Sequence, residues 1–279
     1  MEEERIFSEL DIKISLKEIA KEIKNLKNNK ACGFDLILNE MIKTSQLYLL
    51  ESLQKIFNAV LSTGVYPKIW AKGYIVPIFK NGSKDDPSNY RGITVGSYLG
   101  KLFGKIMNTR LEKFLSSRNI ISLEQIGFCK EKRTSDHHFV LKTLIHNKTQ
   151  KNYTCFIDLK KGFDTVNQNG LFYKLRKIGV SDLFYNVLKS MYKSTELSMR
   201  IDMENLSSNI GVRQGDMENL SSNIGVRQGD NTSPTLFKIF INDLVKVFND
   251  SCEPVSLNCL KLNCLMYADD LVLMSETAE

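Results

Sequence analysis

The stretch LNCLMYADDLVLMS, residues 262–275, decides how the carboxyl-terminal part of the chain folds. It contains two apolar runs, and a short acidic turn with Asp269 and Asp270 lies between them. Short apolar runs on either side of a tight polar turn are typical of neighbouring β-strands. We therefore expect a β-hairpin that carries two carboxylates at its tip.

A second apolar run, TCFIDL at residues 154–159, predicts a strand that ends at Asp158. Apolar-periodic helices are expected between this strand and the acidic turn, over about residues 168–178, 181–193 and 233–248. SMRID at residues 198–202 is a further candidate strand. A carboxylate at the end of an apolar strand is partly buried yet open to a ligand on one side, which makes Asp158 a candidate site residue.

The first 150 residues have a mainly helical pattern. Ser15 and Glu18 form a capping box at the start of an apolar-periodic segment over residues 15–28. A second helix is expected to run to about Leu61, with Leu53, Ile56, Phe57 and Val60 on one side and Gly64 after its end. Further helices are expected over about 98–115 and 135–146, and YIVPIF at 74–79 predicts a strand followed by a polar turn.

Helices that come first and strands that concentrate later predict an α+β fold rather than a doubly wound sheet. We expect a helical region over residues 1–150 and a sheet-containing region over residues 151–279. The charge follows the same division. The first region holds 24 Lys and Arg against 16 Asp and Glu, a net +8, and the second holds 14 against 16, a net −2. This division suits a phosphate-rich partner at the first region and a cation at the second, and a random surface excess is the alternative.

Composition narrows the class of protein. Hydrophobic residues make up 42% and charged residues 25%, which is ordinary for a globular protein with a core. No apolar stretch approaches the roughly 20 residues of a membrane-spanning helix. The first ten residues, MEEERIFSEL, are acidic and lack the apolar core of a signal peptide, so an intracellular location is expected, nuclear or cytoplasmic. The six cysteines contain no C-x-x-C pair, which favours reduced thiols over a zinc site.

Three carboxylates at strand ends suit one chemistry in particular. Phosphoryl transfer to a nucleic-acid 3′ end is assisted by two divalent cations about 4 Å apart, which activate the attacking oxygen and hold the leaving phosphates. Mg²⁺ prefers oxygen ligands and few of them. The combination of Asp158 with Asp269 and Asp270 is therefore a candidate metal site, whereas an isolated Asp-Asp turn is more often solvated.

Several segments resemble the motifs of reverse transcriptases, in matching order and spacing. FIDLKKGFDTV at 156–166 resembles motif A, GVRQGDNTSPTLFKIFINDL at 225–244 resembles motif B, and YADDLVLMS at 267–275 resembles motif C. Upstream segments at 30–43, 76–111 and 124–145 resemble the fingers motifs of the non-LTR, LINE-type retrotransposon enzymes. The resemblance covers about residues 15–275, so one continuous reverse transcriptase domain over about 15–279 is the alternative to two regions.

The resemblance implies a right-hand polymerase fold, with fingers in the first region and an antiparallel palm sheet with packed helices in the second. The chain ends shortly after motif C, so we expect the thumb to be absent. Asp158 and Asp269 are then expected to bind both metals, with Asp270 in a weaker supporting role. Two Mg²⁺ ions are implied as cofactors, and Mn²⁺ is a possible substitute.

The same resemblance assigns residues to the incoming nucleotide. Lys80 and Arg91 are expected to bind its triphosphate, Phe163 to exclude a ribose 2′-OH, and Gln228 with Gly229 to line the template-nucleotide pocket. Tyr267 is expected to lie near the primer end. Without the resemblance, the alternative is that Lys80 and Arg91 are solvated loop cations and that Phe163 and Tyr267 are aromatic side chains that only pack. Asp164 is expected to cap the helix that follows it rather than to bind metal.

A perfect tandem repeat interrupts the motif order. DMENLSSNIGVRQG occurs at residues 202–215 and again, unchanged, at 216–229. The second copy is contiguous with the rest of motif B, so we assign Gln228 and Gly229 of that copy to the site. The first copy is expected to loop out or to displace the strand before it, and a longer loop costs little entropy.

The resemblance implies an RNA template, a DNA primer and deoxynucleoside triphosphates as partners, and no membrane. The predicted activity is RNA-directed DNA polymerisation within a retrotransposon. Two alternatives stay open at this point. One is an inactive truncated remnant that keeps the fold, and the other is an RNA-binding module of the intron-maturase type that uses the basic first region.

Overall fold

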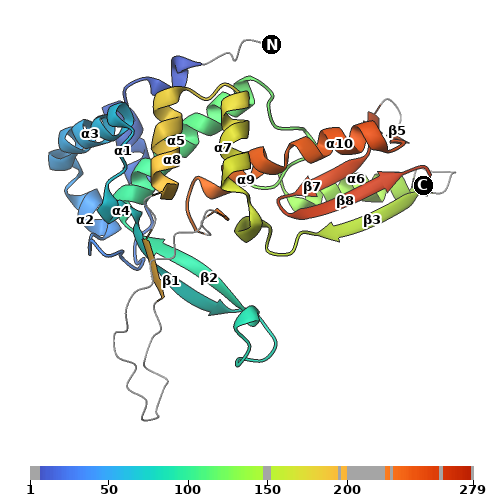
Figure 1. Ribbon diagram of the computed structural model, residues 1–279, viewed down its shortest axis with the longest axis horizontal. Coiled ribbons are helices and arrows are strands. Elements are labelled where there is room, and N and C mark those ends of the chain that lie inside the picture. The colour runs from blue at the N-terminus through green and yellow to red at the C-terminus, as the bar shows by residue number, and fades with distance from the viewer. Residues whose placement is uncertain are drawn as a thin grey trace. The chain divides into compact units, whose positions relative to one another are not determined.

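The computed structural model describes residues 7–146, 152–193, 196–199, 224–226, 229–257 and 260–277. The described chain mixes helices with mainly antiparallel sheets, as the α+β prediction requires (Figure 1). It forms two compact units. Unit 1 comprises Met1–Arg110, Leu175–Asn223 and Arg227–Thr232, and unit 2 comprises Leu111–Lys174, Ile224–Val226 and Ser233–Glu279.

Helices form most of unit 1. They are α1 (Leu16–Lys24), α2 (Asn39–Thr44), α3 (Gln46–Thr63), α4 (Lys68–Ala71) and α8 (Asp182–Lys193), with η1 (Ser8–Asp11) before them and part of α5 (Tyr98–Ser117). The capping box of Ser15 and Glu18 is confirmed at the start of α1, because each side chain accepts a hydrogen bond from the other residue's backbone amide. The helix ends at Lys24, earlier than predicted, where Asn25 caps it.

The core of unit 1 contains a cluster of aromatic rings. Phe57 of α3, Trp70 of α4 and Phe103 of α5 lie with their ring centroids 5.4–6.0 Å apart. The expected apolar face of α3 is confirmed at Leu53, Phe57 and Val60 but is wrong at Ile56, whose side chain is 44% exposed. Leu61 is buried instead, because the buried face follows Leu53, Phe57 and Leu61, which are spaced four residues apart.

The sheet of unit 1 has the strand order β2-β1-β4. β1 (Lys72–Phe79) pairs antiparallel with β2 (Tyr90–Gly96) and parallel with β4 (Glu196–Met199). Pro77 is tolerated within the central strand because β4 pairs only with Lys72–Ile75, so its missing N–H interrupts no bond on that side. A short 3-10 turn, η2 (Pro87–Asn89), precedes β2. The pattern of glycines and polar residues did not predict β2.

Unit 2 is built around a second antiparallel sheet with the order β3-β8-β7. The strands are β3 (Tyr153–Asp158), β7 (Cys264–Tyr267) and β8 (Asp270–Ser275), which confirms the predicted strand and hairpin (Figure 1). Leu144 of α6 (Thr134–His146) packs with Leu265, Met274 and Val255 in a buried cluster. A short pair, β5 (Val255–Leu257) and β6 (Leu260–Leu262), completes the strands of the described chain.

The helix expected over 233–248 is two helices, α9 (Ser233–Ile241) and α10 (Asp243–Ser251). The break falls at Asn242, whose side chain accepts a hydrogen bond from the Ser122 amide and donates one to the Ile120 carbonyl. These contacts to a distant segment fix the break, so a single continuous helix is the wrong prediction. α7 (Gln168–Lys177) and the short η3 (Gly162–Thr165) lie after β3 in the chain.

Candidate active site

Two of the predicted site carboxylates face each other across neighbouring strands. Asp158, the last residue of β3, is the direct register partner of Asp270, the first residue of β8. Side chains of directly opposed residues project from the same face with their Cβ atoms about 5 Å apart. Sheet pairing therefore brings together two acids that are more than a hundred residues apart in sequence.

Asp269 lies in the turn beside this pair. Tyr267 pairs with Asp270, so Ala268 and Asp269 form a two-residue hairpin turn. The carbonyl of Asp269 accepts a hydrogen bond of 3.4 Å from the amide of Leu159, the residue after Asp158. A Cβ atom on Gly162 would lie 3.1 Å from the Cβ of Asp269, so the loop after β3 runs close to the turn. All three carboxylates thus belong to one corner of unit 2.

The three acids affect one another electrostatically. Burial raises the pKa of Asp270, and the negative charges of Asp269 and Asp158 raise it further. Each additional anion disfavours ionisation of its neighbours, whereas a bound cation favours it. The corner is therefore an anionic site that a cation would stabilise.

The donor chemistry of this corner fits a hard divalent cation, because all three candidate ligands are carboxylates. Across the described residues, no three His, Cys, Asp or Glu side chains are arranged to hold an ion as they stand. The carboxylates must therefore turn towards one another for an ion to bind.

Phe163 is held within a stack of aromatic rings in unit 2. Its ring lies parallel to that of Phe237 at 4.5 Å between centroids, and the ring of Phe128 meets it edge-on at 5.9 Å. The carbonyl of Phe163 also accepts a hydrogen bond of 2.8 Å from the amide of Val226. The backbone and the ring of Phe163 are therefore both fixed, five residues after Asp158.

Tyr267 ends β7 next to the turn and is partly buried. The predicted triphosphate ligands Lys80 and Arg91 belong to unit 1 and are exposed. Arg91 is the register partner of Ile78, and the amide of Lys80 donates a hydrogen bond of 2.8 Å to the Asn89 carbonyl. Because strand side chains alternate, Arg91 and Lys80 lie on one face of the β1–β2 hairpin.

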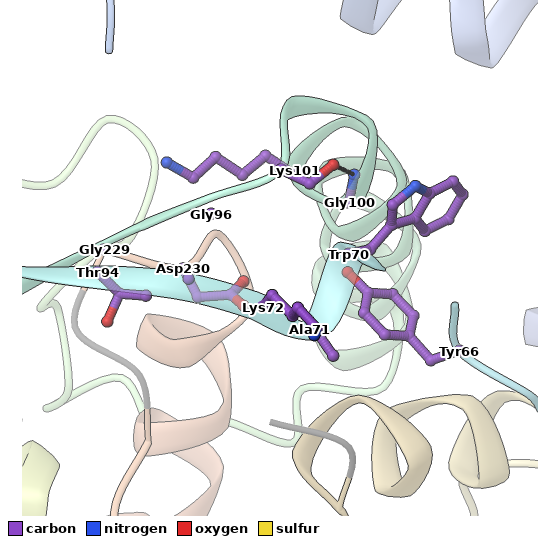
Figure 2. Close-up of a pocket in the computed structure, with 12 residues that line it drawn as sticks. Tyr66, Trp70, Ala71, Lys72, Thr94, Gly96, Gly100, Lys101, Gly229 and Asp230 are labelled. Carbon is purple, nitrogen blue, oxygen red and sulfur yellow. Dashed lines mark hydrogen bonds between the residues drawn. The ribbon is translucent and has the colours of Figure 1, made fainter. Parts of the chain in front are cut away.

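Gly229 lines a small pocket of about 30 Å³ in unit 1 (Figure 2). Its φ is +95°, and a Cβ atom there would lie 3.2 Å from the Thr94 carbonyl oxygen, so a residue without a side chain suits the position. Asp230 and Lys101 also line the pocket. Burial lowers the pKa of Lys101, and the charge of Asp230 opposes that shift.

Gln228 and Arg227 lie outside the described residues, as do residues 202–223 of the tandem repeat. The described end of the second copy forms contacts within unit 2. The Gly225 amide donates to the Val166 carbonyl at 2.7 Å, and the Gln168 side chain donates to the Gly225 carbonyl at 2.9 Å. Motif B therefore contacts the end of motif A and the first residue of α7.

Comparison with known proteins identifies the family. Residues 78–279 match the family described as reverse transcriptase (RNA-dependent DNA polymerase). The chain belongs to the reverse transcriptase family. The matched residues include the acidic corner, Phe163 and the β1–β2 hairpin residues Lys80 and Arg91.

Curated relatives place this reverse transcriptase among retrotransposon enzymes. It is 31% identical over 192 residues to "Probable RNA-directed DNA polymerase from transposon BS" of Drosophila melanogaster, covering 67% of this chain and 21% of the relative. It is 29% identical over 240 residues to "RNA-directed DNA polymerase from mobile element jockey" of the same species, covering 83% and 24%. A third relative, "Retrovirus-related Pol polyprotein from type-1 retrotransposable element R2" of Popillia japonica, is 26% identical over 220 residues, covering 77% and 29%.

These comparisons confirm the prediction of a LINE-type reverse transcriptase domain. The chain spans about a fifth to a quarter of the length of the first two relatives. In the part of this reverse transcriptase that the structure describes, no helix combines the length and the apolar character needed to cross a bilayer.

One residue beside the acidic turn had no predicted role. Gln125 is 2% exposed, and its side chain makes hydrogen bonds with the backbone N–H and the backbone C=O of the turn residue Ala268. The segment EQIGF that contains Gln125 resembles a reverse transcriptase motif, but the resemblance attached no function to the glutamine. Gln125 lies between Glu124 and Ile126, and no helical or strand periodicity marks it in the sequence.

Proposed function

We propose that this chain is the polymerase part of a retrotransposon protein and adds deoxynucleotides to a primer 3′-OH under the direction of an RNA template. The observation that carries the proposal is the pairing of Asp158 with Asp270, with Asp269 in the adjoining turn. Family membership and the retrotransposon relatives support the same activity.

The acidic corner is proposed to hold two divalent cations, Mg²⁺ in the first place and Mn²⁺ as a substitute. Asp158 and Asp269 are the proposed shared ligands, and Asp270 is the proposed supporting ligand. When bound, such ions supply Lewis-acid activation of the primer hydroxyl and neutralise the phosphates. Asp158 and Asp270 lie at the ends of paired strands, which fixes the backbone positions from which these carboxylates would reach the ions.

The resemblance to reverse transcriptases supports proposed roles in binding the incoming deoxynucleoside triphosphate. Lys80 and Arg91 provide exposed cations on one face of a hairpin, which suits phosphate oxygens. Phe163 is the proposed barrier to a ribose 2′-OH, and its fixed ring supports that role. Gln228 and Gly229 are proposed to line the template-nucleotide pocket, and Tyr267 is proposed to lie near the primer end.

We assign the polymerase fingers to residues 1–150 and the palm to residues 151–279, and one continuous reverse transcriptase domain over about residues 15–279 is the alternative. The β1–β2 hairpin in the first region and the β3-β8-β7 sheet in the second support this division. The proposed partners are an RNA template and a DNA primer, and the proposed place of action is the nucleus or the cytoplasm.

Primer extension on an RNA template tests the proposal. The wild-type chain should incorporate deoxynucleotides only when Mg²⁺ or Mn²⁺ is added. Asp269→Asn should abolish incorporation, whereas Asp250→Asn, which removes an exposed carboxylate on α10, should not. Incorporation that persists in Asp269→Asn would contradict the proposed site.

A second candidate function is RNA binding without polymerisation, which the net +8 charge of residues 1–150 favours. Under this alternative the chain retains RNA in a filter-binding assay but extends no primer. Affinity should then fall steeply with salt and should be unchanged by Asp269→Asn.

A further inference from the structure

The side-chain amide of Gln125 encloses the backbone of Ala268. Its Oε1 atom accepts hydrogen bonds from the Ala268 amide at 3.1 Å and from the Gly127 amide at 2.8 Å. Its Nε2 atom donates to the Ala268 carbonyl at 3.3 Å. One side chain therefore satisfies both backbone polar groups of the residue immediately before Asp269.

The backbone around Gln125 is joined to the same hairpin. The Ile126 amide donates to the Met266 carbonyl at 3.0 Å, and the Met266 amide donates to the Glu124 carbonyl at 2.9 Å. Gln125 and Met266 thereby form a parallel β-bridge. The segment Glu124–Gly127 thus lies alongside β7 at a single β-bridge, and its backbone hydrogen bonds fix the position of the glutamine relative to the turn.

The backbone at Gly127 lies too close to the backbone of Ala268 for position 127 to carry a side chain. A Cβ atom on Gly127 would lie 2.1 Å from the Ala268 nitrogen, well inside contact distance. Gln125 and Ala268 are both almost completely buried. Water is therefore not an alternative partner for the backbone of Ala268, and loss of the glutamine amide leaves buried groups unsatisfied.

Ala268 needs this support because its φ is +57°, in the left-handed region. An alanine in that region costs about 1–2 kcal/mol relative to a right-handed conformation. The conformation determines where the backbone directs Asp269, since Asp269 is the next residue. A side chain that binds the N–H and the C=O of Ala268 at once selects one orientation of both adjoining peptide groups.

We propose that Gln125 is a positioning residue that holds the turn at Ala268, so that Asp269 stays beside Asp158 for metal binding. The inference rests on the proposed metal-dependent function of these acids. Glutamine is specific for the role, because the site requires an acceptor towards two amides and a donor towards one carbonyl. Glutamate lacks the donor, and methionine has a similar shape but neither group.

Mn²⁺ binding to the full chain, followed by electron paramagnetic resonance, tests the inference without depending on polymerisation. Gln125→Met and Gln125→Glu should each weaken Mn²⁺ binding by roughly tenfold or more, the scale for groups that orient metal ligands. The matched control is Asn263→Leu, which removes another buried side-chain amide in unit 2. That amide donates hydrogen bonds to the carbonyls of Phe248 and Cys252, which are not part of the turn. The control should bind Mn²⁺ with wild-type affinity.

Single-nucleotide incorporation provides the second readout. Both Gln125 variants should lower kcat by a similar factor and change KM for the deoxynucleotide by less than about twofold, because the nucleotide contacts are intact. Circular dichroism at the assay temperature identifies any variant that does not fold, and the other variant then decides.

The outcomes separate the two proposals. Weaker Mn²⁺ binding in the Gln125 variants of a chain that extends no primer supports the positioning role and overturns the polymerase function. Gln125 variants that match Asn263→Leu in both Mn²⁺ affinity and kcat overturn the positioning role. A wild-type chain that binds no Mn²⁺ overturns both proposals.

Discussion

Asp158 lies directly opposite Asp270 across the β3–β8 ladder, and this one pairing unites motif A with motif C. The hydrogen bond from the Leu159 amide to the Asp269 carbonyl adds the third carboxylate to the same corner. The backbone of this corner is fixed by the strand pairing, and the carboxylate side chains must turn towards one another to share a cation.

Replacing Phe163 should relax sugar selection. Phe163→Val removes the ring that stacks on Phe237, so a ribose 2′-OH should meet less steric resistance. The ratio of kcat/KM for a ribonucleotide to that for a deoxynucleotide should rise by about tenfold or more. Phe139→Val, on the exposed surface of α6, is the control and should leave the ratio unchanged. An unchanged ratio in Phe163→Val would exclude the ring as the barrier.

Two glycine-to-alanine changes in unit 2 should alter stability in opposite directions. Gly127→Ala places a Cβ against the backbone of Ala268 and should destabilise unit 2 by about 1–3 kcal/mol. Gly170→Ala, in α7, meets Phe240 and Asn167 at ordinary contact distances of 3.6–3.9 Å and should stabilise the helix by about 0.5–1 kcal/mol. The midpoints of urea unfolding measure both effects. Equal midpoints for the two variants would show that Glu124–Gly127 does not lie against the turn.

Arg110 should anchor the segment before α1. Its guanidinium is paired with Glu18 at 2.8 Å and donates to the carbonyls of Leu10, Ile12 and Lys13. Arg110→Ala leaves these acceptors without their donor and should cost about 1–3 kcal/mol in the free energy of unfolding. Arg110→Lys should recover only part of the loss, because an ammonium cannot reproduce the planar fork.

The Arg110–Glu18 pair should also make stability depend on pH. Burial raises the pKa of Glu18, but the hydrogen bonds from Arg110 and Ser15 outweigh it, so the folded-state pKa lies below the ordinary 4.5. The contribution is therefore fully present above pH 4.5 and is lost as pH falls through the lower folded-state pKa. The stability difference between wild type and Arg110→Ala should shrink below about pH 4. A difference that is constant from pH 7 to pH 3 would contradict this coupling.

Cysteine reactivity should distinguish the two outer strands of the β3-β8-β7 sheet, since Cys155 of β3 and Cys264 of β7 both pair with Leu273 of β8. Cys264 is fully buried, and burial raises the pKa of its thiol to about 12. Cys155 of β3 is exposed. Iodoacetamide at neutral pH should alkylate Cys155 in the native protein and Cys264 only after unfolding, because the thiolate is the reactive species. Mass spectrometry of the labelled peptides reports both, and native labelling of Cys264 would show that the sheet is not packed as described.

Much of the fold was predictable because its signals are local. The hairpin at 264–275, the capping box at Ser15 and the long helix α5 follow from periodicity and turn chemistry in neighbouring residues. β2 was missed because Gly92, Gly96 and Arg91 interrupt the apolar alternation of that strand. The break at Asn242 was missed because its cause is a pair of hydrogen bonds to residues about 120 positions away.

The candidate site divides in the same way. Asp158, Asp269 and Asp270 stand out because each acid follows or precedes an apolar run that predicts a strand. Gln125 has no such pattern, since its hydrogen bonds to Ala268 join residues 143 positions apart. A side chain whose role is to hold another residue's backbone becomes visible only when both segments are placed in space.

Single-nucleotide primer extension by Asp158→Asn and Asp164→Asn tests the central claim most directly. Each variant removes one carboxylate charge from the eleven-residue motif A, but only Asp158 faces Asp270. Asp158→Asn should lose at least about a thousandfold in kcat while remaining folded, a loss that corresponds to about 4 kcal/mol. Asp164→Asn should stay within tenfold of wild type. Equal activity in the two variants would contradict a shared metal site at the β3–β8 corner.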